Sequence, residues 1–170
     1  VLVMLDAGIG FVYGQSLKST KTMPHIIVGI DTKRNRNRDM IPQSNSKRPG
    51  SGGSKQFREF IKAELLPYIN KNYPNNGKRV LCGGSASGLF VIYTVLTDPG
   101  LFSAYISGSP TIGYCSAFMN EQVMNIASDP KIKGRKLYLA YGDKERFSAA
   151  IRYIPDFSKR LNHYLGKQLR

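Results

Sequence analysis

Residues 79–90, R-V-L-C-G-G-S-A-S-G-L-F, constrain the fold of this chain more than any other stretch. Residues 80–82 form a short, continuously apolar run, which is typical of a strand buried on both faces. Residues 89–96 are apolar almost all round, as a buried helix is. Because only a tight glycine and serine turn, 83–87, separates the two, the pattern predicts a buried strand that turns sharply into a buried helix.

A serine in this turn would stand where a nucleophile elbow places its hydroxyl, above the edge of the sheet. The elbow strains the backbone of the nucleophile, so the residues two before and two after it must be small. Ser85 has Gly83 and Ser87 in these places, whereas Ser87 as nucleophile would be followed by the bulky Leu89. Ser87 replaces the last glycine of G-x-S-x-G. Ser85 is therefore the candidate nucleophile; the alternative is a flexible turn or an anion-holding loop.

Apolar runs and amphipathic stretches alternate along the rest of the chain. We expect strands at 1–5, 26–30, 104–107 and 137–141, and helices at 55–70, 117–128 and 157–169. This alternation predicts an α/β fold with a mostly parallel sheet and helices on both faces. Residues 31–54 lack periodicity and predict a long surface loop, and Pro67 should kink or end its helix.

Chemistry-bearing residues follow the expected strands. They are Asp6-Ala7-Gly8, the segment from Asp31 onward, Ser85, Ser109-Pro110, and residues 143–145. Because the ligand site of an open parallel sheet lies at the carboxyl ends of its strands, these segments should converge on one site.

The net charge and the small numbers of cysteine and histidine limit the possible classes of function. The 170 residues carry a net charge of +14, which would suit nucleic acid, but no basic helix is interleaved with aromatic residues. We therefore expect solvated surface charge and no nucleic-acid partner. Two cysteines and two histidines without ligand spacing predict no metal site, and no organic cofactor is implied. No apolar run approaches the ~20 residues of a membrane span.

Five segments resemble a known family when they are taken in order. They are V-L-V-M-L-D-A-G, I-I-V-G-I-D with R-N-R-D, E-L-L-P-Y-I, G-G-S-A-S-G-L-F, and D-P-G-L-F-S-A-Y-I-S-G-S-P, and together they cover most of residues 1–115. The set is similar to the α/β-hydrolase fold, and within it to the esterases that include esterase D-like and enterochelin esterase-like enzymes. The resemblance implies a serine hydrolase that cleaves carboxylic esters through an acyl-enzyme at Ser85.

The resemblance also implies the remaining parts of the site. The backbone N–H of Ala86 and that of Ala7 or Gly8 would form the oxyanion hole. The catalytic acid would be Glu145, with Asp143 as the second choice. The alternative for both acids is a solvated loop carboxylate paired with a neighbouring cation.

Substrate contacts are expected at the carboxyl edge of the sheet. Arginine binds carboxylates and phosphates as a planar fork, so Arg38 or Arg36 would hold an anionic part of a small ester substrate. Ser109 and Tyr114, which follow the strand at 104–107, are the other candidates. The alternatives are a solvated basic loop, or an Arg38 that pairs with carboxylates of the neighbouring loop and only shapes the site.

Neither histidine suits the role of general base. His25 precedes the second strand, and His163 lies in the last amphipathic helix. The resemblance places the catalytic histidine after a further strand, so we expect residues 1–170 to be the core of a single α/β-hydrolase domain, without its first strands and without the last strand and histidine. A non-catalytic relative that binds a ligand or partner is the alternative. Oligomeric state is left open. A cytoplasmic protein is favoured, and a secreted or periplasmic protein is the alternative if an N-terminal signal precedes this sequence.

Overall fold

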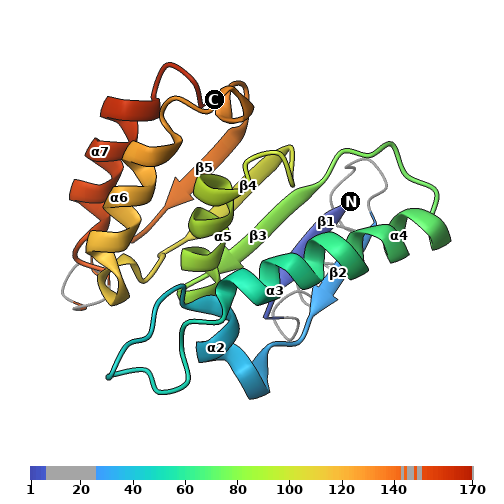
Figure 1. The fold of residues 1–170 in the computed structure, drawn as a ribbon, viewed down its shortest axis with the longest axis horizontal. Coiled ribbons are helices and arrows are strands. Elements are labelled where there is room, and N and C mark those ends of the chain that lie inside the picture. The colour runs from blue at the N-terminus through green and yellow to red at the C-terminus, as the bar shows by residue number, and fades with distance from the viewer. Residues whose placement is uncertain (7–25, 143, 145–147, 149–150, 170) are drawn as a thin grey trace.

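The computed structural model of the protein describes residues 1–6, 26–142, 144, 148 and 151–169. Within these ranges five strands form one parallel sheet in the order β2-β1-β3-β4-β5 (Figure 1). Each strand overlaps the apolar run that predicted it. The strands are β1 (Leu2–Leu5), β2 (Ile27–Ile30), β3 (Val80–Gly84), β4 (Ala104–Gly108) and β5 (Lys136–Ala140).

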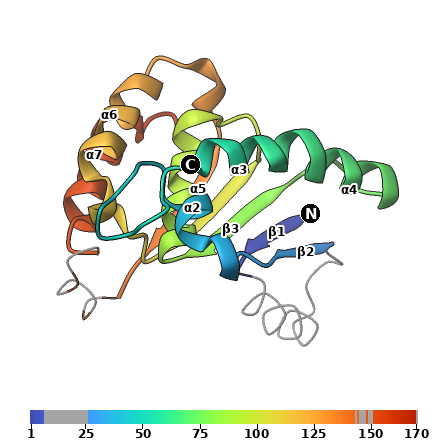
Figure 2. The ribbon, with the colours of Figure 1, turned by 60° about the horizontal axis from the view of Figure 1, so that its bottom comes forward.

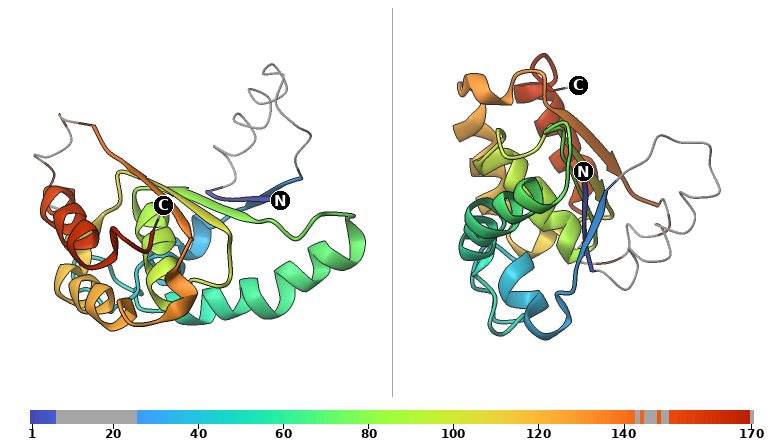
Figure 3. Two further views of the ribbon diagram at one scale, coloured as in Figure 1. Left: turned by 90° about the horizontal axis from the view of Figure 1, so that it is seen from above. Right: turned by 90° about the vertical axis from the view of Figure 1, so that its right-hand side faces the viewer.

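Helices cover one face of this sheet (Figure 3, left). Side chains alternate between the two faces of a strand, and the register aligns Val3, Leu81 and Tyr105 on the covered face, where all three are buried. The elbow helix α5 (Ala86–Thr97) packs on β3 and β4. The longer helices around it are α3 (Ser54–Phe60), α4 (Leu66–Asn72), α6 (Ser116–Ile126) and α7 (Ile154–Leu165). None of the described helices is both long and apolar enough to cross a membrane.

The opposite face of the sheet carries none of the described helices. Met4, Cys82, Ile106 and Tyr138 are aligned across it by the strand register. Ile106 is 38% exposed and Tyr138 is 66% exposed. Helices were expected on both faces, and the described residues supply them on one. The apolar runs predicted the strands correctly, but not the burial of both of their faces in this part of the chain.

Pro67 does not end its helix, contrary to one of the two expected outcomes. α3 continues through a π-helical turn, Ile61–Leu65, into α4, which reaches Asn72. In this turn the Leu66 N–H donates to the Ile61 carbonyl, five residues back. Pro67 lacks an N–H and follows this wider turn, and the helix continues past it.

The expected loop at 31–54 contains helical structure, so this prediction was wrong in part. A 3₁₀ turn, η1 (Lys33–Asn35), leads into the short helix α2 (Arg36–Met40), which packs against α3 and α5 (Figure 2). Met40 and Ile41 are fully buried and fix this helix to the core. So short a helix leaves no periodic pattern in the sequence, because only its last turn reaches the core. Two further 3₁₀ turns are η3 (Ile112–Tyr114) and η4 (Pro130–Ile132).

Candidate active site

Ser85 lies at a sharp turn between β3, which ends at Gly84, and α5, which begins at Ala86. Its backbone has φ +59° and ψ −120°, a conformation that side-chain-bearing residues rarely adopt. Such strain costs on the order of 1–3 kcal/mol and persists only where the surroundings enforce it. The residue is exposed at the carboxyl edge of the sheet. This is the geometry of a nucleophile elbow.

Backbone hydrogen bonds hold this conformation. The Ser85 N–H donates to the Gly108 carbonyl at 2.9 Å. The Ser85 carbonyl accepts from Leu89 N–H at 3.0 Å, within α5, and from Thr111 N–H at 3.2 Å. The N–H of the candidate nucleophile is therefore fixed by β4, and its carbonyl is fixed by α5 and by the loop that follows β4.

Close packing explains the small residues around Ser85. A Cβ at Gly83 would lie 2.7 Å from the backbone carbon and oxygen of Ser87, and 3.0 Å from its Cβ. A Cβ at Gly88 would lie 2.8 Å from the Gly108 carbonyl oxygen. The inference from the sequence that the positions two before and two after Ser85 must be small is confirmed, because these two residues contact each other.

Strained backbone gathers at this edge of the sheet. Asp6 has φ +59° and Ser109 has φ +44°, and with Ser85 they are the only described residues other than glycine with positive φ. They follow β1, β4 and β3, which are neighbours in the sheet. Residues held in such conformations cluster at active sites, so this edge is the strongest candidate for the functional site.

A cleft of about 650 Å³ opens beside Ser85. Its polar side chains are Asp6, Arg36, Ser85 and Ser109, all four of which belong to the segments that the sequence placed at this edge. The apolar side is formed by Leu2, Met4, Leu5, Cys82 and Ile106, together with the backbone of Gly83, Gly84 and Gly108. The cleft can therefore hold an apolar group of a ligand next to a hydroxyl nucleophile.

A charged network lies directly beneath the elbow. The Asp6 carboxylate accepts hydrogen bonds from Thr32 Oγ1 at 2.6 Å, from Arg36 Nε and Nη2 at 3.0 Å each, and from Ser87 Oγ at 2.6 Å. Burial raises the pKa of Asp6, but the hydrogen bonds from Arg36, Ser87 and Thr32 outweigh it and leave the pKa below its ordinary value. Asp6 is therefore an ion-paired carboxylate that links β1, α2 and α5.

The structure describes only some of the other predicted catalytic groups. Ala86 is the first residue of α5, where an N–H has no partner within the helix and can face an oxyanion. The predicted partners in the oxyanion hole, Ala7 and Gly8, lie outside the described residues, and so do the candidate acids, Asp143 and Glu145.

Histidine does not line the cleft among the described residues. His163 lies on the exposed side of α7, edge-on to Tyr164 with 4.7 Å between ring centroids, as the sequence led us to expect of a surface histidine. His25 lies outside the described residues. No group of three His, Cys, Asp or Glu residues in the described ranges could hold a metal ion.

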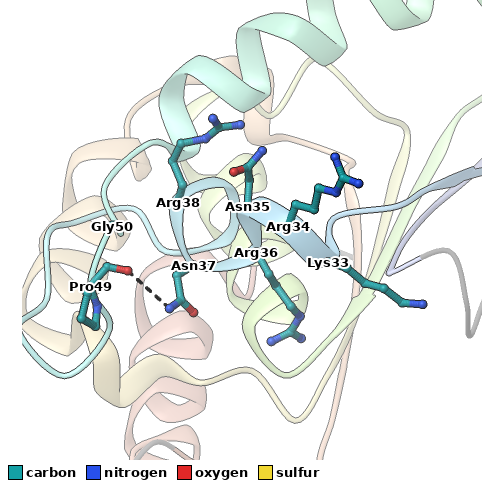
Figure 4. Close-up of a pocket in the computed structure, with 8 residues that line it drawn as sticks. All are labelled: Lys33, Arg34, Asn35, Arg36, Asn37, Arg38, Pro49 and Gly50. Carbon is teal, nitrogen blue, oxygen red and sulfur yellow. Dashed lines mark hydrogen bonds between the residues drawn. The ribbon is translucent and has the colours of Figure 1, made fainter.

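The predicted substrate residues separate into two sets. Arg36 and Ser109 line the cleft with Ser85, whereas Arg38 and Tyr114 do not. Arg38 pairs with the adjacent Asp39, 2.8 Å from Nε to Oδ1, whereas the alternative left open by the sequence was a pair with carboxylates of the neighbouring loop. Figure 4 shows Arg36 and Arg38 pointing away from each other around the same helical turn.

Tyr114 packs beside the irregular segment 41–53. Its ring lies under the Arg48 guanidinium at 4.7 Å, and its hydroxyl accepts a hydrogen bond from Arg48 Nη2. Asn45 Nδ2 donates to the Tyr114 carbonyl at 2.7 Å. In the structure Tyr114 therefore holds this segment against η3.

Sequence reasoning missed the network beneath the elbow. Asp6 was expected at this edge of the sheet but was given no partners, and Ser87 was recognised only as a substitute for glycine. Thr32 was given no role, although its hydroxyl is bonded to Asp6. The one available signal was a carboxylate directly after a buried strand, beside a segment rich in arginine.

The parallel sheet, with a strained serine between β3 and α5 at its carboxyl edge, defines the protein as an α/β-hydrolase. Comparison with known proteins narrows this class. Residues 5–154 match the model of the family described as "Putative esterase", so the chain belongs to this esterase family.

Named relatives agree with this membership. The chain is 31% identical over 173 residues to the ferri-bacillibactin esterase BesA of Bacillus subtilis, covering 86% of this chain and 60% of BesA. It is 26% identical to a siderophore enterobactin esterase of Emericella nidulans, covering 68% of this chain and 40% of the relative. The structure of an IroE-like serine hydrolase from Shewanella oneidensis superposes with a TM-score of 0.77 at 26% identity, covering 99% of this chain and 60% of that one. The chain thus spans less than two thirds of the length of these relatives.

Proposed function

We propose that this protein hydrolyses carboxylic esters through an acyl-enzyme formed on Ser85. The observation that carries the proposal is the strained backbone of Ser85 at the turn from β3 into α5. The names of the esterase relatives support it and weigh against a non-catalytic binding domain. We also take the described residues as part of one domain, because a single hydrophobic core joins the sheet to its helices.

In the proposed reaction, Ser85 Oγ attacks the ester carbonyl carbon and its proton passes to a histidine base. The N–H of Ala86, with that of Ala7 or Gly8, stabilises the oxyanion. The alcohol leaves with the proton from the histidine, and water then hydrolyses the acyl-enzyme by the same route. Glu145, or else Asp143, is the proposed carboxylate that orients the histidine. None of the described residues around the cleft supplies that base.

The proposed substrates are siderophore esters, since both curated relatives are named as esterases of such compounds. The apolar side of the cleft, with Met4 and Ile106, would pack against an aromatic or apolar acyl group. Ser109 would contact the polar part of the ester.

Arg36 is the favoured contact for an anionic part of the substrate, because it lines the cleft and Arg38 does not. Its Nε and Nη2 bind Asp6, while its Nη1 forms no hydrogen bond with another described residue. The pair with Asp6 is close to neutral, so Arg36 would act mainly as a directed donor to a substrate oxygen rather than as a free charge.

Steady-state hydrolysis tests the proposal. Wild-type protein should release acid from an aryl acetate and cleave a ferric trilactone siderophore into its linear ester, with products identified by mass spectrometry. Ser85→Ala should lower kcat by at least ~10³-fold while the protein stays folded. Ser103→Ala, which removes a hydroxyl near the opposite end of β4, should hydrolyse as wild type does. Hydrolysis that survives in Ser85→Ala would exclude Ser85 as the nucleophile.

A further inference from the structure

Ser87 occupies the position where the elbow motif has glycine, and its hydroxyl is fully buried. Ser87 Oγ accepts from the Gly84 N–H at 3.2 Å and lies 2.7 Å from the Gly84 carbonyl oxygen. It also donates to Asp6 Oδ2 at 2.6 Å. The hydroxyl therefore links the N–H of the residue before Ser85 to a carboxylate that directly follows β1, and it lies against the carbonyl of that same residue.

Arg36 also contacts the backbone carbonyl of Gly84. Its Nη2 lies 3.0 Å from Asp6 Oδ2 and 3.5 Å from the Gly84 carbonyl oxygen. Thr32 Oγ1 fills a further acceptor position on Asp6 at 2.6 Å. Ser87 from α5 and Arg36 from α2 contact Gly84 directly, and Asp6, which follows β1, binds both of these side chains. Gly84 is therefore held by side chains from two helices that share one carboxylate.

The strained backbone of Ser85 explains why these contacts to Gly84 matter. The N–H and the carbonyl of Ser85 are held by β4, by the loop after it and by α5. The Ser87 hydroxyl and Arg36 add contacts to the N–H and the carbonyl of Gly84, on the strand side of the elbow. A residue with positive φ relaxes unless its neighbours enforce the conformation. A glycine at position 87 would supply no such hold, because it has no side chain. A serine can supply it, provided that its own hydroxyl is oriented by a fixed acceptor, which is Asp6.

We propose that Asp6, Arg36 and Ser87, which we call the elbow brace, are positioning residues that hold Gly84 and thereby keep Ser85 in its reactive conformation. This inference rests on the proposed function of Ser85. Ser87 touches neither a reacting atom nor the proposed substrate, so its loss should change the rate of attack rather than the affinity for the ester, whereas Arg36 is also the proposed substrate contact. Substrate held by Arg36 would contact the same unit that positions the nucleophile.

Covalent labelling with an alkyl fluorophosphonate separates rate from affinity. The maximal labelling rate reports how well Ser85 is positioned, and the probe concentration at half of that rate reports binding. Ser87→Ala should lower the maximal rate about ten- to a hundredfold, the effect of losing a hydrogen bond to a charged group, and should change the half-saturating concentration less than ~2-fold. Thr94→Val, which removes an equally buried hydroxyl two turns further along α5, should label as wild type does.

A double variant tests whether the brace acts as one unit. Asp6→Asn alone should slow labelling to a similar extent, and Asp6→Asn with Ser87→Ala should be little slower than the slower single variant. Effects that multiply would show that the two residues act independently, and would overturn the brace. An unchanged maximal rate in folded Ser87→Ala would overturn it as well.

Amide hydrogen exchange separates this inference from the proposed function. If wild-type Ser85 is not labelled at all, the proposed function is wrong, and the brace is then judged on the Gly84 amide alone. That amide should exchange at least ~10-fold faster in Ser87→Ala than in wild type and Thr94→Val. Equal exchange in all three proteins would contradict the brace whatever the outcome of labelling.

Discussion

Adding one methyl group at Gly83 should disrupt the elbow more than any comparable change at a surface glycine. In Gly83→Ala the new Cβ would lie 2.7 Å from the backbone carbon and oxygen of Ser87 and 3.0 Å from its Cβ. Carbon atoms in ordinary contact are about 3.5–4.0 Å apart. These neighbours are mostly backbone atoms of α5 and cannot rotate away, so β3 and α5 must separate.

The expected magnitude follows from that separation. Relieving the shortest contacts requires a shift of about 0.7 Å or more between the two elements that carry Ser85. Overpacking of this kind costs about 1–3 kcal/mol, which for a chain of this length lowers Tm by roughly 2–12 °C. A displacement near 1 Å in a reactive group costs on the order of 100-fold in rate. We therefore expect Gly83→Ala to be moderately destabilised and nearly inactive.

Thermal unfolding and fluorophosphonate labelling of the same samples would measure both effects. Gly100→Ala is the matched control, because no atom lies within 4 Å of the Cβ it would add and its backbone is not in the positive-φ region. The control should keep its Tm within ~3 °C of wild type, and its labelling rate should be unchanged. A folded Gly83→Ala that labels at the wild-type rate would refute the view that close packing of Gly83 on Ser87 positions the nucleophile.

Three further experiments test the ionisation of Asp6, the reactivity of the two cysteine thiols and the ion pair of Arg58. Burial raises the pKa of Asp6, but its hydrogen bonds leave the pKa below the ordinary 3.8. The ionised carboxylate therefore stabilises the fold above about pH 4, and this contribution is lost as the pH falls further. Thermal melts should show the stability difference between wild type and Asp6→Asn shrinking from pH 6 to pH 3. Burial raises the pKa of Cys115 to about 12, and it also raises the pKa of the less buried Cys82. Iodoacetamide at pH 8 should therefore alkylate Cys82 first, as peptide mapping would show. Faster alkylation of Cys115 would contradict its burial. Arg58 is buried with its Nε unpartnered, so Arg58→Met should be neutral or stabilising in chemical denaturation, whereas Glu59→Gln should destabilise by leaving the guanidinium without its carboxylate.

Local patterns predicted the elbow because its determinants lie within a few residues of each other. An apolar strand, a turn of small residues and an apolar helix follow one another in residues 79–97, and each leaves a clear signal. The network beneath the elbow has no such signal. Asp6 and Ser87 are 81 residues apart, and only the pairing of β1 with β3 brings them together.

Helix geometry explains why the two candidate arginines were not distinguished in advance. In a loop, Arg36 and Arg38 could both have reached the substrate. They lie instead on α2, where residues two apart point about 200° from each other, so only one of them can face the cleft. The sequence showed no helix here, because Met40 and Ile41 are its main buried contacts.

The identity of the nucleophile is tested most directly by the mass of the protein after reaction with a fluorophosphonate. We predict one phosphonyl adduct per molecule at neutral pH, mapped by peptide sequencing to Ser85 and absent from Ser85→Ala. Denatured protein should carry no adduct, because the reactivity depends on the folded elbow. No adduct on the folded wild type, or an adduct on another residue, would contradict the assignment of Ser85 and the esterase mechanism built on it.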